Sequence, residues 1–147
     1  MMELKILWAS MWGAAEEVAE RVKTLAESKN IDAEMIELND VSMDQLKEMK
    51  NVAVVTSTTG HGDLPTNGEE FYDALKITDL NLREMKFSVC ALGDSSHTYF
   101  CGAGKKVDER LQQLGAVRIL DRQECDGDDE GSDDWAENFL TRLSNGT

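Results

Sequence analysis

Residues 92–102 read Leu92-Gly93-Asp94-Ser95-Ser96-His97-Thr98-Tyr99-Phe100-Cys101-Gly102. The stretch follows an apolar segment at 87–92 that predicts a buried strand, and it precedes a helical pattern at 105–114. Three ring side chains within four positions, beside a glycine, an acid and two hydroxyls, are unusual for a loop. Such a loop can wrap a flat heteroaromatic ligand, with backbone groups at the polar edge of the ligand and rings at its face.

Apolar segments alternate with helical patterns along the whole chain. The apolar segments predict five strands, at 4–9, 33–38, 52–57, 87–92 and 117–120. Stripes of apolar residues at helical spacing predict five helices, at 14–28, 43–49, 68–75, 105–114 and 134–143. This alternation indicates an α/β fold, a three-layer, doubly wound, five-stranded parallel sheet with right-handed crossovers. In such sheets the ligand binds at the carboxyl ends of the strands.

Composition limits the class of protein. The chain has 147 residues, and we expect a single domain over 1–147. The formal net charge of −14 argues against nucleic acid and membrane surfaces, and it favours a basic protein partner. No apolar run approaches the roughly 20 residues of a membrane helix, and a strand is predicted too close to Met1 for a signal peptide. Cys90, Cys101 and Cys125 are odd in number and lack metal-ligand spacing, so we expect no metal and a reducing cytoplasmic location. We also expect a monomer.

The loop after the first predicted strand places small residues at the start of a helix. It comprises Ser10, Met11, Trp12, Gly13, Ala14 and Ala15. A helix start presents unpaired N–H groups and a partial positive charge, and small side chains let an anion approach that backbone. The loop therefore suits a phosphate group; the alternative is an ordinary turn with a buried tryptophan.

The loop after the third predicted strand is rich in glycine and hydroxyl residues. Its candidate binding residues are Thr58, Thr59, Gly60, His61 and Gly62. The Thr58 hydroxyl can bond a phosphate held at the neighbouring strand end, and the two glycines allow backbone angles that are closed to other residues. The alternative is a glycine-rich turn that ends in a helix cap at Asn67.

Taken in chain order, the three loops resemble those of the flavodoxin family, which includes the FMN domains of diflavin reductases. Ser10, Gly13 and Ala15 match the phosphate loop of the family, although Trp12 replaces its usual threonine. Residues 57–67 match a second family motif over about ten positions. The resemblance implies the strand order 2-1-3-4-5 and FMN as the cofactor.

The resemblance also implies which residues of the third loop contact the flavin. His97 stands where the family usually has a tyrosine stacked on the outer face of the ring, and Asp126 matches an acid near the flavin rim. The other implied contacts are Leu92, Gly93, Asp94, Tyr99, Phe100 and Cys101. Packing within the loop is the alternative role for the last three of these residues, and for Cys101 it is the favoured one.

The function that the resemblance implies is that of a low-potential one-electron carrier. No nucleophile–base grouping suggests a substrate site, so we expect no catalytic residues and no enzymatic activity of the chain's own. The expected partners are basic redox proteins, such as an NADPH-dependent flavodoxin reductase and acceptor enzymes. Two alternatives stay open, namely the FMN subunit of a larger oxidoreductase and a small NAD(P)H-dependent flavin reductase.

Overall fold

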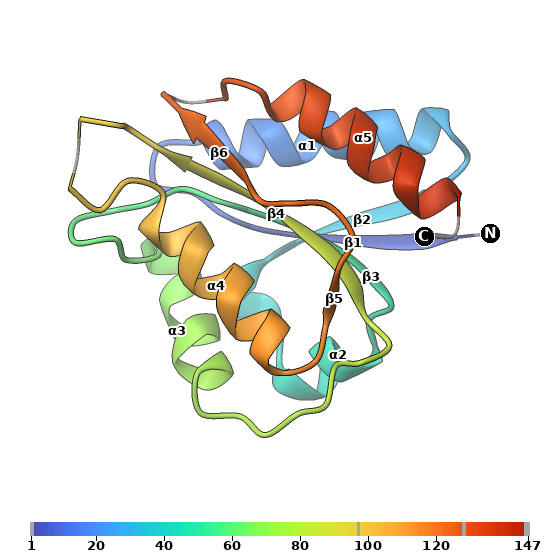
Figure 1. The fold of residues 1–147 in the computed structure, drawn as a ribbon, viewed down its shortest axis with the longest axis horizontal. Helices are drawn as coiled ribbons and strands as arrows, with labels where there is room; N and C mark the ends of the chain where they lie inside the picture. Colours follow the sequence, from blue (N-terminus) through green and yellow to red (C-terminus); the bar gives the residue numbers. More distant parts are fainter. Residues whose placement is uncertain (1, 97, 128, 146–147) are drawn as a thin grey trace.

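A single parallel sheet runs through the middle of the molecule, with helices on both of its faces (Figure 1). The fold is that of a computed structural model, which describes residues 2–96, 98–127 and 129–145. The strands are β1 (Glu3–Ala9), β2 (Asp32–Glu37), β3 (Asn51–Thr56), β4 (Lys86–Gly93), β5 (Val117–Arg118) and β6 (Gln123–Asp126). Their order, β2-β1-β3-β4-β5, confirms the predicted topology, and each strand pairs in parallel with its neighbour.

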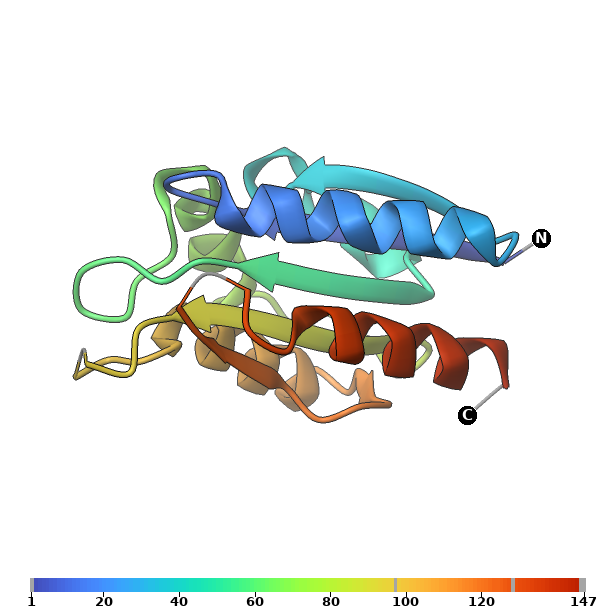
Figure 2. The ribbon, with the colours of Figure 1, turned by 90° about the horizontal axis from the view of Figure 1, so that it is seen from above.

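The helices form the two outer layers. They are α1 (Ala14–Ser28), α2 (Met43–Glu48), α3 (Thr66–Leu75), α4 (Gly102–Gln113) and α5 (Ser132–Ser144), and a 3-10 turn (Leu38–Asp40) follows β2. α1 and α5 cover one face of the sheet, as Figure 2 shows, and the other three helices cover the opposite face. Within the described ranges, no helix has the length and apolar character needed to cross a membrane.

The alternation of side chains along β1 divides the core between the two faces. Leu4 and Ile6 pack under α1 and α5, whereas Leu7 and Ala9 pack toward α3, and all four are fully buried. Burial of a leucine or isoleucine side chain contributes about 1.5–3 kcal/mol. The two apolar layers therefore hold the strand ends, from which the loops extend, in a fixed arrangement.

The predicted extent of the fifth strand, 117–120, is wrong. Only Val117 and Arg118 pair with β4 at its start; the chain then leaves the sheet and rejoins β4 as β6, where Cys125 lies opposite Leu92. Arg118 at the end of β5 and Arg122 just before β6 both donate to the carboxylate of Asp108 in α4, which is fully buried. The ion pairs fix the interruption, and β6 brings its carboxyl end to the same edge of the sheet as β4.

Candidate cofactor-binding site

Three loops converge at the carboxyl ends of β1, β3 and β4, and Figure 2 shows them projecting from the same end of the sheet. Two adjoining clefts, of about 140 and 250 Å³, lie among them and share Thr58, Gly93 and Asp94. The smaller cleft is lined by predicted site residues: Thr58, Thr59, Gly60, Gly93, Asp94, Tyr99, Phe100 and Cys101. The larger cleft is lined by Trp12, Ala14, Ser57, Thr58, Leu92, Gly93, Asp94 and Gly127. The sequence therefore predicted correctly that these loops meet.

The first loop is organised by the Ser10 hydroxyl. Its Oγ accepts hydrogen bonds from the backbone N–H of Gly13 at 2.8 Å and of Ala15 at 3.3 Å. The N–H groups of Trp12 and Ala14 have no acceptor among the described residues, so donors remain available at the start of α1. Gly13 has φ +94°, and a Cβ there would meet no atom of the described residues within 4 Å, so its backbone borders open space. These observations suit an anion, which would accept hydrogen bonds from such donors.

Asn67 connects this loop to α3. Its side-chain oxygen accepts a hydrogen bond from the Ser10 backbone N–H at 3.2 Å, and its amide nitrogen donates to Glu37 at 3.4 Å. The alternative of a helix cap at Asn67 is wrong, because α3 begins one residue earlier, at Thr66 after Pro65. Asn67 therefore positions the first loop from a distant part of the sequence.

The second loop is a tight turn that is tied to α4. The backbones of Thr59 and Asp63 exchange two hydrogen bonds of 2.8 Å, and the turn between them contains Gly60 and Gly62, with φ +48° and +83°. This left-handed region favours glycine. The Thr58 hydroxyl oxygen accepts from the Ala103 N–H at 3.3 Å, which leaves the Thr58 hydroxyl proton as a donor toward the clefts that it lines.

The second and third loops touch backbone to backbone. A Cβ added to Gly102 would lie 2.8 Å from the Gly62 Cα, closer than real Cβ atoms approach. The His61 and Tyr99 rings meet edge to face, with centroids 5.5 Å apart, beside this contact. His61 and Gly62 therefore hold the outer end of the third loop, although they do not line either cleft.

Two carboxylates organise the start of the third loop. Asp126, at the end of β6, accepts hydrogen bonds from the Ser95 N–H at 2.9 Å and the Ser95 hydroxyl at 2.6 Å. These bonds to the charged form lower the pKa of Asp126 below its usual value. Asp94 similarly accepts from the N–H and hydroxyl of Ser96. The rim of the clefts is therefore negatively charged at neutral pH.

Cys101 is part of the scaffold of the site. Its side chain is fully buried, and its thiol donates to the Ala91 carbonyl at 3.3 Å. Burial raises the pKa of Cys101 to about 12. The residue also adopts a left-handed conformation, with φ +55°, where the third loop enters α4. Packing, the favoured alternative for this residue, is confirmed for its side chain.

Three other predicted site residues are exposed to solvent. Met11, Trp12 and Tyr99 are solvent-exposed by 47%, 90% and 50%, so the alternative of a buried tryptophan in the first loop is wrong. Their exposure places apolar and aromatic surface around the clefts. His97 lies outside the described residues.

Ser57 and Gly127 line the larger cleft, yet sequence reasoning missed both. Ser57 follows β3 directly, and Gly127 follows β6, so each stands at the carboxyl end of a strand. The rule that ligands bind at this edge would have found Gly127 if the second half of the fifth strand had been recognised.

The fold and site together define a class: doubly wound α/β proteins that bind a nucleotide-type cofactor at the carboxyl edge of the sheet. The family described as Flavodoxin matches residues 6–139, and the chain belongs to that family. The chain superimposes on a mutant flavodoxin from Pseudomonas aeruginosa with a TM-score of 0.86, at 31% identity, over 97% of this chain and 99% of that one. A Streptococcus pneumoniae flavodoxin gives the same TM-score at 29% identity, over 99% of each chain.

A relative in sequence is larger than this chain. The flavoprotein alpha-component of NADPH sulfite reductase from Bacillus subtilis is 37% identical over 144 residues, which make up 97% of this chain but 24% of that protein. The chain spans a quarter or less of the length of such curated relatives. The family and these relatives imply FMN as the cofactor. The free donors at the start of α1 and the adjoining clefts fit its phosphate and its flat ring.

Proposed function

We propose that the chain forms one domain, binds FMN among the three loops and carries single electrons between a reductase and acceptor proteins. The observation that carries this proposal is the pair of adjoining clefts at the carboxyl edge of the sheet, which residues from all three loops line. FMN, when bound, supplies one-electron transfer at its ring, and the protein supplies binding and electrostatics.

The phosphate end of FMN is assigned to the first loop. The Ser10 hydroxyl, the N–H groups of Trp12 and Ala14, and the Thr58 hydroxyl proton are the donors for it. Hydrogen bonds to a charged acceptor contribute roughly 1.5–3 kcal/mol each, which outweighs the screened repulsion from distant acids on this chain. These local donors let a protein of net charge −14 hold an anion.

The ring of FMN is assigned to the smaller cleft, between Thr59 and Gly60 on one side and Asp94 and Tyr99 on the other. The negative charge of Asp94 disfavours further negative charge in the cleft, which lowers the reduction potential. Asp63, by contrast, is paired with Lys106 at 3.3 Å, so its influence is partly neutralised.

The docking of redox partners is assigned to the rim of the two clefts. Trp12 and Tyr99 expose aromatic surface beside the clefts, and the acids around them attract a basic redox protein. On this proposal the chain has no substrate site of its own, and it depends on a reductase for electrons and on an acceptor to remove them.

A second candidate, the FMN-binding part of a larger flavoprotein, is favoured by the lengths of the relatives. Residues of this chain match only 24% of the Bacillus subtilis sulfite reductase component. The same three-loop site would then pass electrons within one assembly, and the chemistry assigned to the loops would be unchanged.

Spectroscopy of the purified protein tests the proposal. We expect a yellow protein, or an apoprotein that binds FMN and discriminates against riboflavin, which lacks the phosphate. NADPH alone should leave the flavin oxidised, and adding an NADPH-dependent flavodoxin reductase should reduce it. A colourless protein that does not respond to excess FMN would refute the cofactor assignment. Rapid reduction by NADPH alone would instead identify a flavin reductase.

A further inference from the structure

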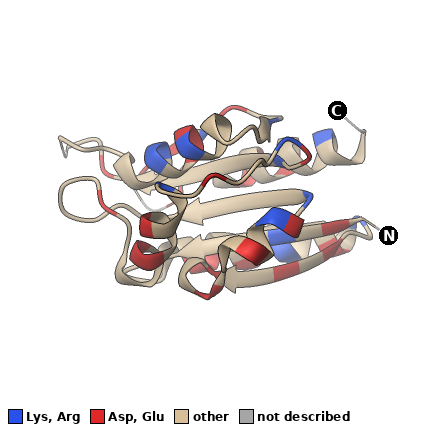
Figure 3. Cartoon of the chain, turned by 90° about the horizontal axis from the view of Figure 1, so that it is seen from below, with Lys and Arg blue, Asp and Glu red and all other residues tan. Residues whose placement is uncertain are grey.

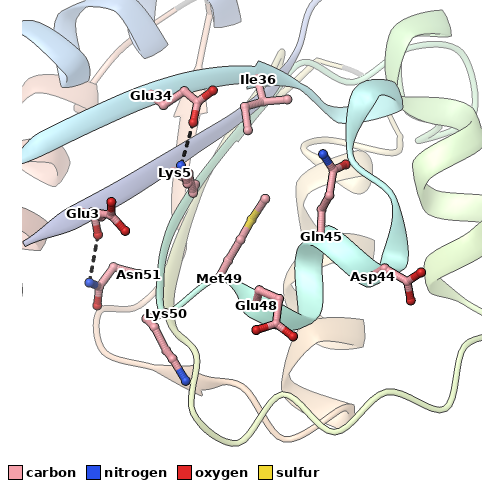
Figure 4. A pocket seen from close by; sticks show the side chains of 10 residues that line it. All are labelled: Glu3, Lys5, Glu34, Ile36, Asp44, Gln45, Glu48, Met49, Lys50 and Asn51. Atoms are coloured by element: carbon pink, nitrogen blue, oxygen red, sulfur yellow. Dashed lines mark hydrogen bonds and ion pairs between the residues drawn. The ribbon is translucent and has the colours of Figure 1, made fainter.

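A groove of about 580 Å³ lies beside β2 (Figure 4). It is at the end of the sheet remote from the cofactor loops. Lys5, Glu34 and Ile36 of the sheet form one side of it, and Asp44, Glu48 and Met49 form the other. Glu3 and Asn51 also line it, at the starts of β1 and β3, whereas the cofactor loops follow the ends of those strands.

The groove exists because α2 is too short to cover this part of the sheet. α2 has six residues, from Met43 to Glu48. On the same face of β1, Leu7 and Ala9 are buried in the core, whereas Lys5 is half-buried and Glu3 is exposed. The sequence therefore changes from apolar to charged side chains where the helix layer ends, and Ile36 stays half-buried beside the opening.

β2 also presents an unpaired edge. It pairs with β1 from Asp32 to Glu37, and within the described ranges no strand lies on its other side. An edge strand offers outward N–H and C=O groups that can pair with another extended chain. The groove and this edge adjoin, since Glu34 and Ile36 belong to both.

The charged residues of the groove determine which kind of polypeptide segment can bind beside β2. Lys5 is paired with Glu34 at 2.6 Å, and Lys50 with Glu84 at 3.1 Å, so the two lysines of the groove are already neutralised. Asp44 and Glu48 have no ion-pair partner among the described residues. Figure 3 shows acidic positions along this side of the molecule, with basic positions between them, one of which is Lys47 on α2. A second copy of the chain, with its charge of −14, would be repelled.

We propose that an extended, lysine- or arginine-bearing segment of a partner protein adds to the outer edge of β2 and lies in this groove. Main-chain hydrogen bonds to β2 give affinity, an apolar side chain rests on Ile36 and Met49, and basic side chains approach Asp44 and Glu48. The surface is separate from the cofactor rim, so a partner held here leaves the exposed edge of the site open to a redox contact.

A short acetylated peptide of alternating lysine and valine is the probe, titrated into the FMN-loaded protein and followed by amide NMR and calorimetry. We expect shift changes at residues 32–37 and 44–49, and little change at the cofactor loops. The same peptide with alternate backbone nitrogens methylated keeps every charge but loses N–H donors. It should bind about tenfold more weakly or worse if strand pairing holds it.

Charge-reversal variants of the protein provide a second test of the proposal. The double variant Asp44→Lys, Glu48→Lys should weaken the peptide about tenfold or more. Glu27→Lys with Glu109→Lys makes the same change in net charge at exposed positions on α1 and α4, and it should have a smaller effect. Equal weakening by both pairs, equal binding of the methylated peptide, or shifts that centre on the cofactor loops would each overturn the proposal.

Discussion

Replacing Gly102 by alanine places a methyl group between the second and third loops. In the present structure the added Cβ would lie 2.8 Å from the Gly62 Cα and 3.2 Å from the Gly62 carbonyl oxygen. Ordinary contacts begin at 3.4 Å, so the two backbones must part by about 0.6 Å. Neither atom belongs to a flexible side chain, so the overlap cannot be relieved by a rotamer change.

Overpacking of this kind costs about 1–3 kcal/mol. The free protein can relieve the strain by letting the loops separate, whereas FMN binding needs them in their present spacing. The cost therefore falls mainly on the bound state, and 1–3 kcal/mol corresponds to an increase of about 5- to 150-fold in the Kd of FMN. The unfolding free energy of the apoprotein should fall by less.

Fluorescence quenching of FMN during titration with apoprotein measures the Kd, and urea unfolding measures the stability. Gly115→Ala is the matched control. Gly115 follows α4 at its other end and has φ +99°, and the nearest atom of the described residues would lie 3.5 Å from an added Cβ. That variant should lose about 1–2 kcal/mol of stability from left-handed strain and keep the Kd unchanged. A folded Gly102→Ala protein with the wild-type Kd would show that the spacing of the loops does not control binding.

Four further outcomes are expected. Ser10→Ala should reduce the preference for FMN over riboflavin by about tenfold or more, because one donor to the phosphate is lost; Ser28→Ala, at the far end of α1, should leave the ratio of the two dissociation constants unchanged. Asp108→Asn should lower the unfolding free energy in urea by about 3 kcal/mol, because it leaves two half-buried arginines without their carboxylate. Because the pKa of Asp126 is lowered in the folded protein, its ionisation stabilises the fold at pH values above the ordinary Asp pKa, and this stabilisation is lost as the pH falls through the folded pKa. In the variant Asp126→Asn, the unfolding free energy should therefore decline less steeply below about pH 4. With its pKa near 12, the buried Cys101 thiol should resist iodoacetamide at neutral pH until the protein unfolds, as mass spectrometry would show; fast labelling of the native protein would contradict its burial.

Most helices and strands could be predicted from sequence periodicity, because the spacing of apolar residues reports directly on which face of a helix or strand is buried. α1 has the predicted bounds, 14–28. α3, α4 and α5 begin two or three residues earlier than predicted, because their first turns carry glycine, hydroxyl or acidic residues rather than an apolar stripe. Such first turns are defined by backbone geometry that periodicity does not report.

The interruption of the fifth strand could not be predicted in the same way. It depends on Arg118 and Arg122 meeting a carboxylate from α4, ten and fourteen residues earlier in the chain. Local sequence records no such contact, and a two-residue strand carries no alternation to detect.

The loops of the site were predicted in position but not in their internal contacts. Glycines, hydroxyls and rings at strand ends indicated where a ligand binds, because parallel strands bring their carboxyl ends to one edge. That Asn67 holds the Ser10 backbone, and that Gly62 meets Gly102, depends on how distant elements pack.

Most residues of the two apolar layers lie outside the loops that face the cofactor, although Leu64 of the second loop and Leu92, which lines the larger cleft, belong to them. Phe87 and Phe139, among the largest fully buried side chains, lie in opposite layers and line neither cleft. The buried core that stabilises the sheet and the loops that bind the cofactor are therefore nearly independent parts of one chain. Losing the flavin should loosen amide protection at the strand ends alone, and the composition of the loops can vary widely before the architecture is put at risk.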